Sequence, residues 1–370
     1  MRVLLSAGGT AGHIYPAIAI AEILRTHHPD CEIAFVGTPA GMENRLVAEA
    51  GYPLHHVRVA GLQRRVSFAN VKAGVLFFTS QKQARRLLHA YRPDLVVGTG
   101  GYVCYPLLRT AARLGVPCAV HESNALPGLS VKMLSRHVDA VLVNYPVTAK
   151  YLPHARRVVR VGNPTRASFE GYTRTAARQK LQLGSGDFLV LSFGGSLGAE
   201  AINQACVDMM LREKSDSALR FVHSTGRTHY EQWQAVFAAA PRHCRQKHRL
   251  LPYISDMPLY MQAADVVICR AGAMTLSELC AVGRAAILVP SPHVTNNHQY
   301  ENAAVLWRAG ACELLEEKDL SAEALRACVE RLRTNRTLRQ NMEAAMRASG
   351  VQGANEKLYA ALRPLLPATL

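Results

Sequence analysis

The sequence predicts an α/β protein built from two Rossmann-like domains, and three observations predict it. Short runs rich in Val, Ile and Leu alternate with stretches of helical periodicity, which is typical of parallel sheets built from βαβ units. The alternation breaks at 158–164, where VVRVGNP ends in Gly-Asn-Pro, and then starts again. Each series opens with a strand followed by Gly-Gly-Ser/Thr-x-Gly, GGTAG at 8–12 and GGSLG at 194–198. The same arrangement is therefore expected twice.

The elements follow in order along both series. The first series holds strands at 2–7, 32–37, 95–100, 118–123 and 140–145, with helices at 16–28, 42–51 and 105–114. The second series holds strands within 188–200, 219–226, 248–254, 264–272 and 285–292. We therefore divide the chain into an N-terminal domain, 1–163, a C-terminal domain, 164–345, and a helical tail, 346–370, that packs back on the N-terminal domain.

Length and composition limit the class of protein. A chain of 370 residues, 49% hydrophobic and 19% charged, is larger than a single core usually becomes. Its nine cysteines are scattered without a C-x-x-C pair, which argues against a disulfide framework and a zinc cluster. No run approaches the roughly 20 apolar residues of a membrane span, and the N-terminus lacks the features of a signal peptide. We expect a cytoplasmic protein.

The positive charge is concentrated in the first half. Residues 1–163 hold 19 of the 43 lysines and arginines but only 8 of the 27 acidic residues. This half is expected to meet an anionic partner: nucleic acid, anionic lipid or a phosphorylated substrate. Nucleic acid is disfavoured, because the chain has neither an RNP-type aromatic strand nor a recognition-helix pattern.

The two glycine-rich turns are candidate ligand sites. GGTAGH fits neither the G-x-G-x-x-G dinucleotide fingerprint nor the P-loop, but a helix N-terminus still suits a diphosphate. We expect the turns to face each other across an interdomain cleft at the carboxyl ends of the sheets. His13 is a candidate general base there, since a neutral imidazole accepts a proton from a hydroxyl. The alternative is that these glycines and His13 serve only packing.

Two further stretches place polar residues at strand ends. HESNALPG, 121–128, leaves Glu122 and Asn124 either in the cleft or in hydrogen bonds within their loop. In CRAGAMTLSE, 269–278, we expect a helix to begin near Thr275, with Glu278 at the spacing of a capping box. A glutamate at that point of an α/β sheet is also where a ribose diol is commonly held.

Eight motifs, taken in order, resemble those of a known family. They are GGTAGHIYPA, GGYVCYP (100–106), HESNALPG, VGNPTR (161–166), GGSLGA (194–199), YISDM (253–257), CRAGAMTLSE and NNHQYENA (296–303). Together they resemble the MurG family, the peptidoglycan glycosyltransferases that convert lipid I to lipid II, over nearly the whole chain.

The resemblance implies a fold and an activity. It implies the GT-B glycosyltransferase fold, two Rossmann-like domains facing across a cleft. It implies inverting transfer of GlcNAc from UDP-GlcNAc to the 4-hydroxyl of the muramyl sugar of lipid I at the inner face of the membrane, with no metal or other cofactor. Two alternatives stay open: a transferase of the same fold with another lipid or glycoside acceptor, and a non-catalytic protein that binds nucleotide sugars.

The resemblance also implies roles for individual residues. In the C-terminal domain, Ile254 would meet uracil through its backbone, Glu278 would bind the ribose, and Gln299 would touch the donor sugar. Arg166 and Ser196 would face the diphosphate. Along the nucleoside and phosphate would lie Ala273, Met274, Thr275, Leu276 and Ser277. On the N-terminal side, the implied contacts to the sugar and reaction centre come from Thr10, Ala11, Gly12 and Asn124, with His13 as the leading base.

Three stretches depart from the family pattern. Ala11 stands where the family usually has glycine, and Cys104 and Tyr105 stand where serine and glycine are usual. GLQRRVSF, 61–68, departs most, so no acceptor role is carried onto Arg64 or Arg65.

One stretch is a candidate for membrane docking. NVKAGVLFFTSQKQARRLL, 70–88, is expected to be helical with apolar residues on more than one face. The docking residues would be Lys72, Val75, Leu76, Phe77, Phe78, Lys82, Arg85 and Arg86. The alternative is a helix buried on two sides with basic side chains reaching solvent.

Overall fold

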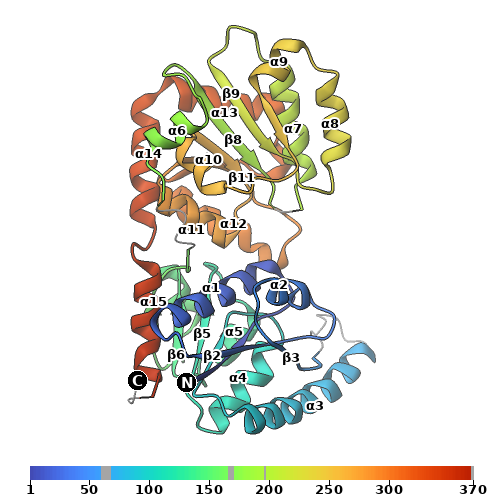
Figure 1. The fold of residues 1–370 in the computed structure, drawn as a ribbon, viewed down its shortest axis with the longest axis vertical. Coiled ribbons are helices and arrows are strands. Elements are labelled where there is room, and N and C mark those ends of the chain that lie inside the picture. Colours follow the sequence, from blue (N-terminus) through green and yellow to red (C-terminus); the bar gives the residue numbers. More distant parts are fainter. Residues whose placement is uncertain (60–67, 166–170, 196, 368–370) are drawn as a thin grey trace. The chain divides into compact units, whose positions relative to one another are not determined.

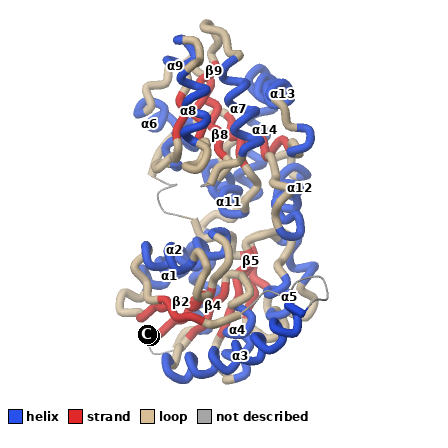
Figure 2. Tube along the Cα trace, turned by 90° about the vertical axis from the view of Figure 1, so that its right-hand side faces the viewer, coloured by secondary structure: helices blue, strands red, loops and turns tan. Residues whose placement is uncertain are grey.

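The computed structural model describes residues 1–59, 68–165, 171–195 and 197–367, and for residues 68–78 it describes the backbone. The chain divides into two compact units. Unit 1 comprises Met1–Thr165 and Val351–Leu370, and unit 2 comprises Arg166–Gly350. Each unit is an α/β domain with helices on both faces of one parallel sheet (Figures 1 and 2).

Unit 1 contains a seven-stranded sheet in the order β3-β2-β1-β4-β5-β6-β7, with every neighbouring pair parallel. The strands are β1 (Arg2–Ser6), β2 (Glu32–Gly37), β3 (Leu54–His56), β4 (Leu95–Gly98), β5 (Cys118–Glu122), β6 (Ala140–Val143) and β7 (Val158–Arg160). The helices are α1 (Ala11–His27), α2 (Glu43–Glu49), α3 (Phe68–Tyr91), α4 (Cys104–Arg113), α5 (Leu129–Leu134) and α15 (Ala354–Leu362), with 3-10 turns at Pro146–Tyr151 and Arg363–Leu365.

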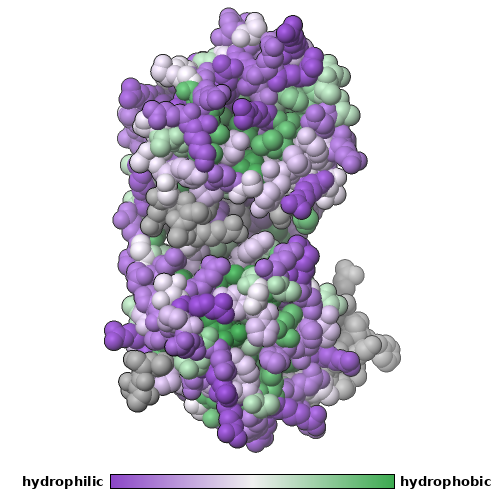
Figure 3. Space-filling view, viewed as in Figure 1, coloured by the Kyte–Doolittle hydropathy of each residue, from purple (hydrophilic) through white to green (hydrophobic). Residues whose placement is uncertain are grey.

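The strands are apolar throughout because both faces of the sheet are covered. In β1, Val3 and Leu5 enter the core beneath α1, α2 and α15, while Leu4 enters the core beneath α3, α4 and α5. Hydrophilic side chains cover most of the visible face of each unit (Figure 3). The strand order reverses between β1 and β4, and ligands of open α/β sheets bind outside such a switch point, at the carboxyl ends of the strands.

Unit 2 repeats this plan with six parallel strands in the order β10-β9-β8-β11-β12-β13. The strands are β8 (Phe188–Phe193), β9 (Leu219–Ser224), β10 (Arg249–Leu251), β11 (Val266–Cys269), β12 (Ala285–Leu288) and β13 (Cys312–Leu314). The helices are α6 (Arg174–Lys180), α7 (Glu200–Leu211), α8 (Tyr230–Ala238), α9 (Arg242–Lys247), α10 (Met257–Ala263), α11 (Ala273–Val282), α12 (His298–Arg308), α13 (Ala322–Thr334) and α14 (Arg336–Ser349), with 3-10 turns at Thr295–Asn297 and Glu317–Asp319. Its switch point lies between β8 and β11.

The C-terminal segment of the chain returns to unit 1. In α15, Leu358 and Leu362 are buried in the core on the α1 side of the sheet. The ring of Tyr359 stacks on His27 with centroids 3.6 Å apart, and its hydroxyl lies 3.0 Å from Nε2 of His28. A helix separated from α1 by more than 300 residues thus completes the first domain.

Helix α1 begins five residues before the start that we predicted at 16. Proline, which stands at position 16, is a residue type favoured in the first helical turn. In the structure Pro16 lies inside the helix. Because proline has no backbone N–H, the carbonyl of Gly12 lacks its usual hydrogen bond from position 16. Gly12 is exposed, so water can satisfy that carbonyl and the cost of the missing bond is reduced.

Candidate active site

The first glycine turn leads into a helix whose own first turn carries no acidic residue and no side-chain cap. Thr10 is the N-cap of α1, but its side chain makes no capping hydrogen bond, and the first turn contains no acidic residue. Thr10 and Gly12 are exposed and Ala11 is half-buried. The positive end of the helix dipole therefore faces solvent without a carboxylate from its own helix, which suits a negative charge on a ligand.

His13 follows in the same turn and is held from the neighbouring strand. Its Nδ1 lies 3.1 Å from the carbonyl oxygen of Thr99, just after β4, and the Thr99 hydroxyl donates to the His13 carbonyl at 2.7 Å. Gly100 has a φ of +118°, and a side chain there would collide with the imidazole. Because a carbonyl only accepts, the neutral ring carries its proton on Nδ1. Nε2 is then the basic nitrogen.

Asn124 lies in the loop after β5, at the same edge of the sheet as His13. Its backbone N–H and its side-chain amide both donate to Oε1 of Glu122, at 2.9 and 3.0 Å, and the N–H of Gly128 donates to Oε2 at 2.9 Å. Glu122 is buried, and burial raises its pKa, which these hydrogen bonds partly offset. Glu122 therefore organises its own loop, and Asn124 is oriented by that loop.

One residue that the sequence reasoning missed touches the first glycine turn. Glu43, the first residue of α2, is fully buried and accepts a hydrogen bond from the N–H of Gly9 at 3.2 Å. The only sign of it in the sequence is the segment around it, GTPAGMEN at 37–44, which contains two glycines and resembles a loop next to a ligand site. The pairing partner is 34 residues away, so spacing alone does not show the contact.

The second glycine turn, between β8 and α7, differs from the first in its charge. Gly195 and Gly198 have φ values of +98° and +85°, and a side chain at Gly198 would collide with the Thr225 carbonyl. The first turn of α7 carries Glu200, whose Oε2 lies 3.1 Å from Nδ1 of His229 and accepts from Trp233 at 3.3 Å. Ser196 lies outside the described residues, as does Arg166.

Helix α11 corrects our prediction of its start. It begins at Ala273 with Gly272 as N-cap, not near Thr275, and its N-terminus has no side-chain cap. Glu278 consequently lies in the second turn and forms no capping box with Thr275. Glycine serves as N-cap because it takes the required extended conformation without a competing side chain. This N-terminus, like that of α1, has no acidic residue in its first turn.

The residues of α11 that we expect to contact the donor differ in how far their side chains are buried. Leu276 is 1% exposed and belongs to the same core cluster as Ile254, which is 3% exposed. Ala273 is buried as well, so these three residues can meet a ligand only through backbone atoms or the edge of a side chain. The half-buried residues of this stretch are Met274, Thr275, Ser277 and Glu278.

Gln299 lies in the first turn of α12, after an irregular segment. Its Oε1 accepts a hydrogen bond from the backbone N–H of Ser291 at 2.9 Å, which fixes the amide. Asn296 and Asn297 just before it have φ values of 56° and 53°. Consecutive non-glycine residues in this conformation store backbone strain, which is concentrated at functional sites.

The predicted docking segment lies on α3, a single helix. Lys82, Arg85 and Arg86 are exposed, while Ala84 and Leu88 are buried against the sheet. The side chains of the other candidates, Lys72, Val75, Leu76, Phe77 and Phe78, lie outside the described residues, as do Arg64 and Arg65. Of the helices in the described part of the chain, none is long and apolar enough to cross a bilayer.

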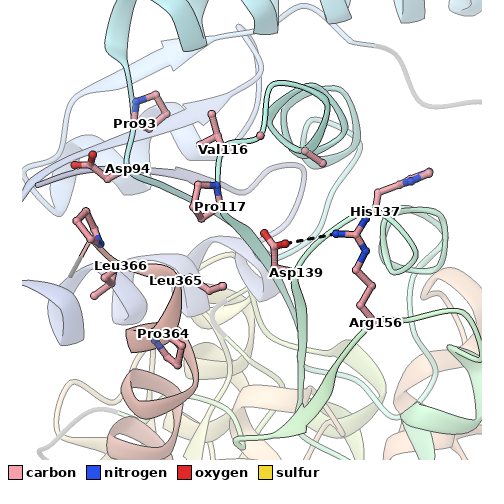
Figure 4. A pocket seen from close by; sticks show the side chains of 13 residues that line it. Pro93, Asp94, Val116, Pro117, His137, Asp139, Arg156, Pro364, Leu365 and Leu366 are labelled. Carbon is pink, nitrogen blue, oxygen red and sulfur yellow. Dashed lines mark ion pairs between the residues drawn. The ribbon is translucent and has the colours of Figure 1, made fainter.

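A cavity of about 680 Å³ lies elsewhere in unit 1 (Figure 4). It is lined by Asp94, Pro117 and Asp139, which precede β4, β5 and β6, and by Pro364–Pro367. Arg156 pairs with Asp139 there at 3.6 Å. This cavity is at the amino ends of the strands, opposite the edge that carries His13 and Asn124, so it is separate from the candidate site.

Sequence comparisons place the chain among known proteins. Residues 3–143 match the glycosyltransferase family 28 N-terminal domain, and residues 189–358 match the glycosyltransferase family 28 C-terminal domain. Two similar curated proteins are UDP-N-acetylglucosamine–N-acetylmuramyl-(pentapeptide) pyrophosphoryl-undecaprenol N-acetylglucosamine transferases. That of Alkaliphilus oremlandii is 38% identical over 99% of both chains, and that of Acetivibrio thermocellus is 39% identical over 99% of this chain and 98% of its own.

Solved structures agree with the sequence relatives. The crystal structure of Acinetobacter baumannii MurG matches 98% of this chain and 99% of its own with a TM-score of 0.80 and 29% identity. The calicheamicin glycosyltransferase CalG4, at 16% identity and a TM-score of 0.68 over 99% of both chains, shares the fold. Both predictions, the two-domain GT-B fold and the family, are confirmed. The chain belongs to the MurG family of UDP-N-acetylglucosamine–N-acetylmuramyl-(pentapeptide) pyrophosphoryl-undecaprenol N-acetylglucosamine transferases.

Proposed function

We propose that this protein transfers GlcNAc from UDP-GlcNAc to the 4-hydroxyl of the muramyl sugar of lipid I, giving lipid II for peptidoglycan synthesis. The observation that carries this proposal is the 38–39% identity to transferases of that name over 99% of the chain. The half-buried His13 and the open N-termini of α1 and α11 support it, since they supply a base and two sites for negative charge.

Unit 2 binds the donor in this proposal. The N-terminus of α11 and Arg166 face the diphosphate together with Ser196, Glu278 holds the ribose hydroxyls, and the backbone at Ile254 meets uracil. Two features support the α11 assignment: its first turn has no carboxylate, and glycine at the N-cap lets a phosphate approach the backbone. Gln299, whose oxygen is held by Ser291, offers its NH₂ group to the sugar.

Unit 1 activates the acceptor. Nε2 of His13 takes the proton of the 4-hydroxyl while that oxygen attacks the anomeric carbon of GlcNAc. The bond between this carbon and the UDP oxygen breaks, and its electron pair leaves with the diphosphate. The helix N-terminus and Arg166 stabilise the charge that develops on UDP. A single displacement inverts the anomeric centre. Thr10, Ala11, Gly12 and Asn124 border the sugar.

The acceptor is bound to a lipid, so we place the reaction at the inner face of the cell membrane. The basic side chains of Lys82, Arg85 and Arg86 on the exposed side of α3 support attraction to anionic lipid. The remaining contacts would come from Lys72, Val75, Leu76, Phe77 and Phe78. This makes the protein a peripheral membrane enzyme.

The function is tested by supplying labelled UDP-GlcNAc with one acceptor at a time. We expect lipid II and UDP in equal amounts with lipid I, and no transfer to diacylglycerol or sterol acceptors. UDP release only when lipid I is present distinguishes a transferase from a protein that merely binds nucleotide sugars. Transfer to another acceptor at a higher rate than to lipid I would contradict the proposal.

A further inference from the structure

Glu43 is a buried carboxylate at the base of the first glycine turn. Its side chain is fully buried, and both of its oxygens are engaged. Oε1 accepts from the backbone N–H and from the hydroxyl of Thr38, each at 2.7 Å, and Oε2 accepts from the N–H of Gly9 at 3.2 Å. It thereby joins the loop after β2 to the loop after β1.

The surrounding backbone leaves room for this group. Side chains added at Gly37 or Gly41 would collide with Glu43, and one at Gly8 would lie within 3.1 Å of its Oε1. Burial alone would raise the pKa of Glu43, but the bonds from Thr38 and Gly9 outweigh burial and lower it. A buried carboxylate is costly unless donors satisfy it, so the ionised form depends on these contacts.

Gly9 immediately precedes the N-cap of the helix that carries His13. Gly9 is exposed and has a φ of +86°, and a side chain there would meet nothing within 4 Å. A side chain at Gly9 would therefore point into open space. The hydrogen bond to Glu43 is the polar contact that orients the Gly9 peptide, while Thr99 and Gly100 hold the imidazole from the other side.

We propose that Glu43 is a positioning residue for the transfer reaction, which orders Gly8–Thr10 and thereby the first turn of α1 and His13. The inference rests on the proposed function of His13 as the base. Glu43 touches no substrate and acts through the N–H of Gly9. Small displacements of a catalytic group have large effects on rate, because the reacting atoms must be aligned.

The test is Glu43→Gln, assayed with lipid I and UDP-GlcNAc. The glutamine oxygen can keep the two Thr38 donors, but its NH₂ then faces the N–H of Gly9, so the loop contact is lost selectively. We expect kcat to fall about tenfold or more and the KM for UDP-GlcNAc to change less than twofold. The matched control is Glu49→Gln, an exposed glutamate on the same helix that pairs with Arg45, which should keep wild-type kinetics.

A double-mutant cycle with His13→Ala separates positioning from general destabilisation. If Glu43 acts through His13, Glu43→Gln should lower kcat no further in the His13→Ala background. Equal effects in both backgrounds would overturn the positioning role. A second outcome would also overturn the positioning role: Glu43→Gln keeps the wild-type kcat while His13→Ala lowers it. In that case His13 would remain the base. A wild-type kcat for His13→Ala would overturn both assignments.

A second variant covers the case in which Glu43→Gln does not fold. Thr38→Val removes one of the two donors to Oε1, which lets the carboxylate shift away from the N–H of Gly9. We expect kcat to fall about two- to fivefold. The variant loses one hydrogen bond to a charged group, and the remaining bond from the Thr38 N–H partly compensates for that loss. An unchanged kcat in Thr38→Val, with the thermal midpoint within about 2 °C of wild type, would then count against the proposal.

Discussion

The two glycine-rich turns look alike in sequence and differ in electrostatics. Both lie between a central strand and a helix at the switch point of a parallel sheet. The helix after GGTAG has no acidic residue in its first turn, whereas the helix after GGSLG begins with Glu200. Within unit 2, the open N-terminus belongs instead to α11. The second glycine of each turn has a positive φ, +86° at Gly9 and +98° at Gly195, but Gly12 lies inside α1 whereas Gly198 has a φ of +85° before α7 begins. The glycine pattern therefore fixes only part of the backbone shape, and the two helices also differ in the charge of their first turns.

The largest expected effect is the loss of kcat when His13, in the first turn of α1, is replaced. His13→Ala should lower kcat by about 10²–10⁴-fold, because it removes the group that accepts the hydroxyl proton. The KM for UDP-GlcNAc should change less than twofold, since the donor binds to unit 2. Steady-state kinetics with lipid I measure both constants. The control is His154→Ala, which replaces an exposed histidine of the same unit. If the kcat of His13→Ala lies within threefold of the wild-type value, another residue must be the base.

The next effect tests the donor side of the comparison. Glu278→Ala should raise the KM for UDP-GlcNAc about tenfold or more, because hydrogen bonds from the ribose hydroxyls to a carboxylate are lost. The kcat should stay within threefold. The matched control is Glu323→Ala, an exposed glutamate on α13 that pairs with Arg212. An unchanged KM would remove Glu278 from the ribose site.

A third effect concerns the membrane side of unit 1. Replacing Phe77 and Phe78 together with serine should weaken sedimentation with anionic vesicles about tenfold or more, since two large apolar side chains no longer enter the lipid. Activity on a water-soluble lipid I analogue should be retained. Val236→Ser, at an exposed apolar residue of unit 2, serves as the control. Equal vesicle binding by the double variant would favour the alternative of a helix buried on two sides.

The smallest effect sharpens the contrast between α7 and α11. Glu200→Gln should tighten UDP binding by about two- to threefold at low salt, because a negative charge near the diphosphate is removed. Calorimetric titration with UDP measures this change. Asp208→Asn, near the other end of α7, controls for net charge. Equal or weaker UDP binding by Glu200→Gln would mean that the diphosphate does not sense this carboxylate.

Most of the fold could be predicted because its cause is local. A strand such as Val3–Leu5 is apolar on both faces, and the alternation of such strands with helical stretches is visible without any neighbour. Element starts were less predictable. Both α1 and α11 begin earlier than expected, because Pro16 and Thr275 resemble start residues and the backbone continues past them. The three-residue strands β3 and β13 were missed, since each is defined by its pairing partner.

The candidate site divides in the same way. The residue types of the glycine turns, His13 and Glu278 stand out in the chain itself, because their chemistry is carried by short motifs. Which nitrogen of His13 is basic and which buried glutamate holds the Gly9 peptide depend on contacts across 86 and 34 residues. Such contacts arise only when parallel strands bring distant loops to one edge of a sheet, so the folded chain alone decides them.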